Sequence, residues 1–497
     1  MKKRKLIICI IIVICILLAF SATVTIDWLY ETFGHLSMDE IIFHIKVPME
    51  GTNTDILYRF AKECLWKVLL PTAIISFILI YPMVRDLKFI DDKIHTSEKR
   101  RVVVISFCLS ILILTVSIVK IVKTTDIKDY IKDQFDSSSF IADEYVVPQN
   151  TKIEFPEEKR NLIYIFLESM ETTFYSVEDG GLSEQDLIPE ISKLAKENVN
   201  FSDTDKLGGA STLTGTTWTV GAMSAQTAGV PLKLTIDDNA LGDYSIFLGG
   251  AYSIGEVLEN NGYHNFLLLG SDATFGGRKH LFEQHGNYEI WDFESAIQEN
   301  KVSEKIWWGY TDDLLFEYAK DKILYLAQQD QPFNFTMLTA DTHFPDGYLC
   351  EECPDIWDEQ YKNVISCSSK RVGDLIEWIK EQEFYDNTTI VITGDHLSMQ
   401  SNFFELEEGQ EYEKKVVSII INPAIEAKNT NHRKYSTMDL YPTTLAALGA
   451  IIDGDKLALG TNLFSEEETL IEKYGLQYVN EELKKNSRFY DNNILVK

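Results

Sequence analysis

Long apolar runs dominate the first quarter of the chain and alternate with charged loops. Three runs have about the 20 apolar residues that a helix needs to cross a bilayer, and they lie at residues 6–26, 64–84 and 102–119. The first follows a basic cluster, as a cleaved signal peptide does, but it is longer than a signal core and two more runs follow. We expect residues 1–123 to form a membrane anchor with three transmembrane helices.

Basic residues beside these runs predict the orientation of the anchor. The N-terminal segment and the loop after the second run are rich in such residues, whereas the loop after the first run holds only Lys46, Arg59 and Lys62. The two rich segments contain Lys2, Lys3, Arg4, Lys5, Arg85, Lys88, Lys93, Lys99, Arg100 and Arg101. Because positively charged loops stay in the cytoplasm, we expect a multi-pass protein of the cell membrane with a cytoplasmic N-terminus and an extracytoplasmic catalytic domain.

Beyond a polar juxtamembrane linker at residues 124–158, short apolar runs typical of strands alternate with helical patterns. The strand-like runs are residues 161–167, 264–270, 333–339, 388–393 and 416–421, and the helical patterns are 187–198, 311–328, 358–383 and 438–449. Such alternation is typical of an α/β domain whose central sheet is mostly parallel. We therefore expect this domain to occupy residues 159–497.

The charge of the chain is divided as unevenly as its hydrophobicity. The residues after position 125 hold 65 of the 76 acidic side chains and only 30 of the 46 basic ones, a net charge of −35. A surface of this sign repels nucleic acid, which excludes it as a partner. The acidic excess otherwise indicates only a soluble, solvated surface.

Three of the seven cysteines lie outside the predicted anchor. Cys350, Cys353 and Cys367 would face an oxidising environment in which a disulfide can form. One of the three must stay unpaired within the chain, and the sequence leaves the pairing open. A zinc site is disfavoured because no second Cys/His pair follows at a matching spacing.

Two of the predicted strands end at potential metal ligands. Glu168 directly follows the strand at 161–167, and Asp395 and His396 follow the strand at 388–393. Open α/β sheets bind ligands beyond the carboxyl ends of their strands. Either group alone is more often a cap or a surface feature, but two carboxylates and an imidazole at such strand ends suit Mn²⁺, Mg²⁺ or Zn²⁺.

A third candidate element is the segment at residues 208–232. Its first half is small and hydroxylic and its second half is compatible with a helix, which places Thr216 or Thr217 at a helix N-terminus. Backbone N–H groups and the helix dipole favour an anion there. A threonine at this position is also an ordinary helix cap, so this segment alone does not indicate catalysis.

Taken together, these segments carry an ordered set of motifs. They are YIFLES at 164–169, GTTWT at 215–219, GSDATFGGR at 270–278, THFPDGY at 342–348, ITGDHLSM at 392–399, STMDLYPTTLAALG at 436–449 and GTNLFS at 460–465. Over residues 150–465 the sequence resembles the sulfatase-like branch of the alkaline phosphatase superfamily. Within that branch it looks most like the phosphoglycerol transferases that decorate periplasmic glucans and like the lipoteichoic acid synthases.

This resemblance implies roles for individual residues. The family's metal ligands match Glu168, Thr217, Asp395 and His396, its substrate-binding residues match His343 and Arg278, and its nucleophile matches Thr217, with Thr216 as the fallback. One divalent metal ion is implied, with Mn²⁺ favoured over Mg²⁺ and Zn²⁺. His343 is expected either to donate a proton to the leaving oxygen or to bind the phosphate.

The implied reaction is transfer of phosphoglycerol from a membrane phospholipid, most simply phosphatidylglycerol, to a hydroxyl of an envelope glycan or polymer through a covalent threonine intermediate. Gly276 and Gly277 stand where lipoteichoic acid synthases have Trp-Asn. This departure removes an aromatic contact to glycerol and favours decoration of a glycan over polymer synthesis. Trp307 and Trp308 could line the pocket or lie at the membrane surface, but packing is the commoner use of such residues.

Four alternative functions can be compared with this one. A phosphoethanolamine transferase or a phosphodiesterase would use the same motifs, because the choice of headgroup depends on pocket shape. A true sulfatase is disfavoured because no Cys/Ser-x-Pro-x-Arg sequence lies near residue 217. A membrane-tethered binding protein on a disabled hydrolase scaffold would have lost a ligand or the nucleophile, and all four of these residues are present.

Overall fold

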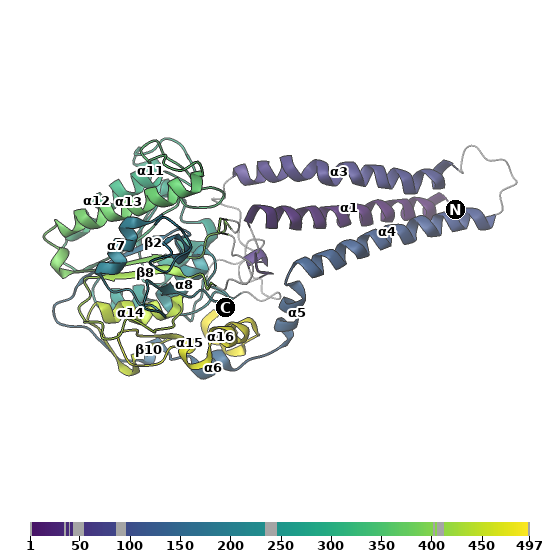
Figure 1. Cartoon of the computed structure of the whole chain (residues 1–497). Helices are drawn as coiled ribbons and strands as arrows, with labels where there is room; N and C mark the ends of the chain where they lie inside the picture. Colours follow the sequence, from purple (N-terminus) through teal and green to yellow (C-terminus); the bar gives the residue numbers. More distant parts are fainter. Residues whose placement is uncertain are drawn as a thin grey trace. The chain divides into compact units, whose positions relative to one another are not determined.

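The computed structural model describes residues 2–33, 36–38, 40–42, 54–85, 96–233, 246–400, 403–404 and 412–495 (Figure 1). Its contacts divide the chain into two units. One comprises Met1–Met38 and Asn53–Ile131, and the other comprises Asp39–Thr52 and Lys132–Lys497. The segment Asp39–Thr52 thus groups with the larger unit, although it follows the first helix of the smaller one in the sequence.

The smaller unit contains three long helices, α1 (Lys2–Phe33), α3 (Thr54–Arg85) and α4 (Thr96–Thr124). Each of them is long and apolar enough to cross a membrane, in agreement with the three predicted spans. Ile12, Ile16, Leu79 and Met83 form a small buried contact between α1 and α3, whereas most other apolar side chains of these helices face outward. Helices that are apolar on their outer faces suit a lipid environment.

Part of the orientation argument falls on residues that the structure does not describe. Lys46, Lys88 and Lys93 lie outside the described residues. The cytoplasmic placement of the N-terminus therefore stays a prediction from the distribution of basic residues.

A seven-stranded sheet forms the centre of the larger unit. Its strand order is β3 (Gly209–Ala210), β8 (Val416–Ile421), β7 (Thr388–Gly394), β2 (Asn161–Leu167), β6 (Phe333–Leu338), β4 (His264–Leu269) and β5 (Glu289–Trp291). The five strands from β7 to β5 run parallel, whereas β8 is antiparallel to β7 and β3 is antiparallel to β8. The expectation of an α/β fold with a mostly parallel sheet is confirmed, and only the two shortest strands of the sheet were not expected.

Both faces of this sheet are buried, which explains why its strands are continuous apolar runs. Along β2, Leu162, Tyr164 and Phe166 face the core with α8 (Thr219–Ala228), α9 (Ile254–Asn260) and α14 (Leu440–Ala447). Ile163, Ile165 and Leu167 face the core with α7 (Pro189–Glu197), α12 (Asp312–Ala327) and α13 (Gln360–Lys380). The successive side chains of a strand point to opposite faces, so β2 contributes to two cores (Figure 1).

Shorter elements complete the larger unit and the connection to the anchor. They are α5 (Ile127–Phe135), α6 (Phe140–Glu144), α10 (Arg278–Gln284), α11 (Phe293–Gln298), α15 (Leu470–Tyr474), α16 (Leu476–Lys484), α17 (Arg488–Tyr490) and the antiparallel pairs β1 (Ile153–Glu154) with β9 (Ile451–Ile452) and β10 (Lys456–Leu457) with β11 (Gly460–Thr461). The segment 124–158 therefore contains regular structure. Val146 and Ala458 exchange two backbone hydrogen bonds of 2.9 and 2.7 Å, which hold this segment to the domain.

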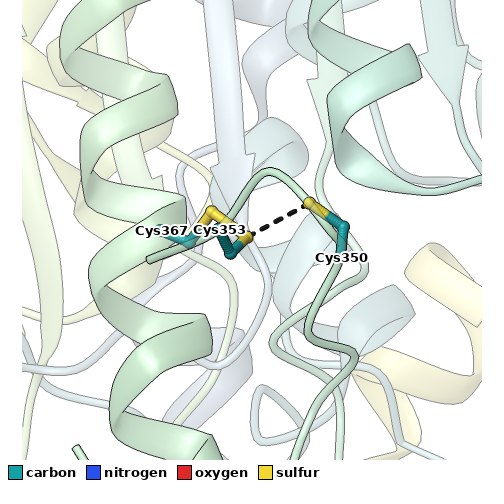
Figure 2. Close-up of side chains that lie close together, drawn as sticks. All are labelled: Cys350, Cys353 and Cys367. Atoms are coloured by element: carbon teal, nitrogen blue, oxygen red, sulfur yellow. Dashed lines mark hydrogen bonds between the residues drawn. A yellow bond between two sulfur atoms is a disulfide. The ribbon is translucent and has the colours of Figure 1, made fainter. Parts of the chain in front are cut away.

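The three cysteines of the larger unit lie together, with Cys367 on α13 and Cys350 and Cys353 in the segment before it (Figure 2). Cys353 and Cys367 form a disulfide, and the Sγ atom of the free Cys350 lies 3.2 Å from that of Cys353. Arg371 places a guanidinium nitrogen 2.9 Å from the Cys350 sulfur. The disulfide occupies two of the three sulfurs and the guanidinium already supplies a positive charge, so this cluster does not fit zinc.

The arrangement of these sulfurs predicts how the bridge responds to mutation. Peptide mapping of non-reduced protein is expected to recover Cys353–Cys367 and a free Cys350. In Cys367→Ser, oxidation should join Cys350 to Cys353, because their sulfurs are already adjacent. Cys350→Ser should keep the original bridge. A Cys350–Cys353 peptide from the unaltered protein would contradict the pairing.

Candidate active site

The carboxyl ends of two neighbouring parallel strands bring the predicted metal ligands together. Strands β2 and β7 pair in a register that sets Leu167 beside Gly394, so Glu168 and Asp395 leave the sheet at the same edge. One carboxylate oxygen of each and a ring nitrogen of His396 all lie within 4.8 Å of one another. All three side chains are at most 2% exposed. The structure thus places these three predicted ligands in one buried cluster.

Neighbouring backbone groups fix the orientation of the cluster. The N–H groups of Ser169 and His396 both donate to Asp395 Oδ1, at 2.8 and 2.7 Å, and the Ser169 hydroxyl donates to Glu168 Oε1 at 2.7 Å. His396 Nδ1 donates to the Leu397 carbonyl at 2.8 Å. This leaves Nε2 facing the carboxylates, 3.4 Å from an oxygen of each. Such a bond on the far nitrogen is the usual way in which a metal-binding histidine is oriented.

The electrostatics of the cluster fit a bound cation. Asp395 Oδ2 is buried and has no hydrogen-bond partner. Burial and the charge of Glu168 raise the pKa of Asp395 to about 7. Burial lowers the pKa of His396, but the charges of Asp395 and Glu168 outweigh this effect and raise it to about 9. Without a metal the cluster retains protons to offset its two carboxylates, and a divalent cation would replace them.

The predicted threonine segment leads into α8, which begins at Thr219. Thr217 and Thr219 are both half-buried. The Thr217 hydroxyl donates to Glu40 Oε1 at 2.8 Å, whereas the Thr219 hydroxyl lies 3.5 Å from His396 Nε2. The N-terminus of a helix is suited to bind an anion such as a phosphate, and α8 has ten residues. Thr219 is thus a second candidate nucleophile, which the sequence analysis did not single out.

The fallback nucleophile is poorly placed for chemistry. Thr216 is fully buried. Its hydroxyl donates to the Leu213 carbonyl at 3.0 Å and accepts from the Leu213 N–H at 2.9 Å. These two bonds close a local turn and hold the hydroxyl inside it, so the geometry favours Thr217 or Thr219.

Arg278 is buried at the first position of α10. The preceding Gly276 and Gly277 have φ values of 69° and 81°, a conformation that glycine adopts without strain. The guanidinium donates to the carbonyls of Phe275 and Asp272 at 3.0 and 2.7 Å. Burial lowers the pKa of Arg278 to about 10, so the side chain stays positively charged at neutral pH. Arg278 thus provides a positive charge that interacts electrostatically with the carboxylate of Glu168.

His343 has the opposite electrostatic character. Its Nδ1 donates to the Phe344 carbonyl at 2.8 Å, and its ring centroid lies 4.4 Å from that of Trp308. Burial is the main cause that lowers the pKa of His343 to about 4. The ring is therefore neutral at physiological pH, with a lone pair on Nε2. This geometry favours a hydrogen-bond acceptor over the proton donor that was one of the two expectations.

Two further residues belong to this site although the sequence did not point to them. Glu40 lies 177 positions from Thr217, and no motif or periodicity connects the two. Packing was the favoured expectation for Trp308, with pocket lining as an alternative. Its ring contacts those of His343 and Phe275, with centroid distances of 4.4 and 5.4 Å. The position of Thr219 at the start of the helical pattern was the one available sequence signal for an additional hydroxyl.

The raised pKa values predict how metal binding depends on pH. Because Asp395 and His396 have pKa values above those of the unfolded chain, their protonation stabilises the metal-free protein at low pH, and this stabilisation is lost as pH rises through about 7 and then about 9. Added Mn²⁺ must displace those protons. The rise in melting temperature that Mn²⁺ causes in chelator-treated protein is expected to grow from about pH 5 to about pH 8.

Two variants provide the comparison for this measurement. Asp395→Asn should abolish the metal-dependent rise, because the amide lacks the charge that holds the cation. Asp346→Asn removes an exposed carboxylate and should leave the rise intact. A metal-dependent rise of equal size at every pH would contradict the protonated cluster.

Comparison with known proteins places this site in a family. Residues 160–450 match the family model described as Sulfatase. Phosphoglycerol transferase I from Escherichia coli is 30% identical over 320 residues, which are 62% of this chain and 40% of that protein, and the same values hold for other strains. The match thus spans well under half the length of these curated relatives.

One solved structure shows the same fold, and a second is similar at a lower TM-score. Lipooligosaccharide phosphoethanolamine transferase A from Neisseria meningitidis, an integral membrane protein, covers 88% of this chain and 83% of its own, with a TM-score of 0.52 and 12% identity. The lipoteichoic acid synthase LtaP from Listeria monocytogenes covers 66% of this chain and 81% of its own, with a TM-score of 0.48 and 17% identity.

Proposed function

The chain belongs to the sulfatase family, and we propose that it transfers phosphoglycerol from a membrane phospholipid, phosphatidylglycerol, to a hydroxyl of an envelope glycan or polymer. The observation that carries this proposal is the buried cluster of Glu168, Asp395 and His396, with the Thr219 hydroxyl at the start of α8 lying 3.5 Å from His396 Nε2. The likeness to phosphoglycerol transferase I supports the choice of headgroup. The three apolar helices support an anchor in the membrane that holds the lipid donor.

Glu168, Asp395 and His396 would hold one divalent ion, for which Mn²⁺ is our preferred candidate. Such an ion lowers the pKa of a nearby hydroxyl and offsets charge on the reacting phosphate. Nε2 of His396, once it has lost its proton, and the unpartnered Oδ2 of Asp395 are the two atoms best placed to bind the ion.

The reaction proceeds in two transfers. Thr217 Oγ1 forms a bond to phosphorus and gives up its proton, while the bond from phosphorus to the diacylglycerol oxygen breaks and that oxygen takes up a proton. The acceptor hydroxyl then attacks the same phosphorus, loses its proton and releases Thr217 as a hydroxyl. Covalent catalysis of this kind divides one difficult displacement into two easier ones.

Arg278 and His343 would bind different parts of the substrate. Arg278 already uses two of its N–H groups on backbone carbonyls, and its remaining donors and its charge suit the anionic phosphate oxygens. His343 is neutral and presents an acceptor nitrogen, which suits a glycerol hydroxyl. The catalytic domain would face the outside of the cell, with the N-terminus in the cytoplasm, as the basic residues predict.

The covalent intermediate provides a direct test of headgroup and nucleophile. Full-length protein incubated with phosphatidylglycerol and quenched rapidly is expected to carry phosphoglycerol on the peptide that contains Thr217, as read by mass spectrometry. Thr217→Ala should abolish the adduct and the release of diacylglycerol. A parallel incubation with phosphatidylethanolamine tests the rival headgroup.

Thr219→Ala is the matched control for this experiment. It should slow the reaction without removing the adduct, because its hydroxyl lies beside His396. Loss of the adduct in Thr219→Ala and its persistence in Thr217→Ala would assign the nucleophile to Thr219. An adduct of phosphoethanolamine alone would refute the proposed headgroup.

Arg278→Lys tests the proposed phosphate contact. A lysine keeps the charge but lacks the planar set of donors, so kcat/KM for phosphatidylglycerol is expected to fall about 10- to 100-fold. Arg160→Lys is the control, because Arg160 also donates to backbone carbonyls, those of Thr388 and Asn422. An equal loss in both variants would mean that Arg278 supports the fold only.

A further inference from the structure

Glu40 is a carboxylate that contacts the proposed nucleophile and comes from outside the motif-bearing part of the chain. Its Oε1 accepts a 2.8 Å hydrogen bond from the Thr217 hydroxyl. Its negative charge also contributes to the raised pKa of His396. Glu40 belongs to the segment Asp39–Thr52, which groups with the larger unit although it lies in the sequence between the two candidate spans α1 and α3.

A third carboxylate near Glu168 and Asp395 is electrostatically unfavourable unless it has a specific partner. Among the described residues, the set of potential ligand atoms within 4.8 Å of one another contains Glu168, Asp395 and His396 but not Glu40. Glu40 accepts a hydrogen bond from the Thr217 hydroxyl. Glu40 therefore acts on the site through Thr217 and is not placed as a further metal ligand.

This hydrogen bond determines which side of the Thr217 oxygen is available. A threonine hydroxyl has one hydrogen to donate and two lone pairs. When the hydrogen is directed at Glu40, the lone pairs face elsewhere and are available for attack. The bond also selects one rotation of the hydroxyl in a side chain that is already stiff at χ1. Orientation of this kind accelerates a reaction because fewer unproductive geometries compete.

We propose that Glu40 is a positioning residue that aligns the Thr217 hydroxyl. This inference rests on the proposed function, with Thr217 as its nucleophile. It gives Glu40, which lies in the sequence between two candidate membrane spans, a role in the chemistry that is separate from anchoring.

Full-length protein in detergent micelles tests this role in a single-turnover assay of the covalent adduct. Glu40→Ala is expected to slow adduct formation about tenfold or more, the loss expected for one hydrogen bond to a charged group, with KM for phosphatidylglycerol unchanged. Glu40→Gln should stay within about threefold of the unaltered protein, because the amide oxygen accepts the same bond. The Mn²⁺-dependent rise in melting temperature should not change in either variant.

Two further variants separate alignment from a general structural effect. Glu31→Ala removes an exposed carboxylate from α1 and should have no effect. Thr217→Ser introduces a hydroxyl with more rotational freedom, so Glu40→Ala should cost more in that background than in the unaltered protein. Equal, additive losses would contradict alignment.

Three results would overturn the proposal. They are an unchanged rate in Glu40→Ala, an equal loss of rate in Glu40→Gln, and a change confined to KM, which would place Glu40 on the headgroup. A chromogenic phosphodiester, bis(4-nitrophenyl) phosphate, provides a second substrate. If the unaltered protein hydrolyses it but forms no adduct with phosphatidylglycerol, the proposed headgroup fails, and Glu40 is judged by the same comparison of rates on the second substrate.

Discussion

The repulsion between two buried carboxylates is the constraint on which the site depends. Glu168 and Asp395 leave adjacent parallel strands at the same edge, where water is excluded and like charges repel strongly. Backbone N–H groups that donate to one oxygen of Asp395 and the proton on His396 offset part of this repulsion. The second oxygen of Asp395 is left without a partner. The arrangement is unfavourable by itself and becomes favourable with a cation.

Arg278, the start of α8 and His343 complement the negative charge of these two carboxylates. A phosphate that approaches two carboxylates needs positive charge on its other sides, and Arg278 supplies a charge that burial does not remove at neutral pH. The start of α8 adds unpaired N–H groups. His343, neutral and packed against Trp308, adds no charge and suits the uncharged part of a headgroup. The site thus combines anionic carboxylates, the cationic Arg278 and the neutral His343.

Much of the fold and part of the site could be predicted from the sequence, because both depend on local patterns. Strands β2 and β7 are apolar runs, directly followed by Glu168 and Asp395 respectively. The carboxyl ends of neighbouring parallel strands lie at the same edge of the sheet. The two-residue strand β3 carries no such pattern. The state of His343 depends on burial, which the THFPDGY motif does not encode. Glu40 could not be predicted, because its contact with Thr217 arises from chain folding between segments 177 positions apart.

The backbone bonds that hold Asp395 have a consequence for how the protein matures. Ser169, His396 and the Leu167 carbonyl hold this residue by hydrogen bonds within the protein. These bonds do not depend on a metal, unlike the contacts of small domains that stay unfolded until they bind zinc. We therefore expect folding and metal uptake to be separable steps, so that an ion supplied to the folded protein is enough to restore its activity.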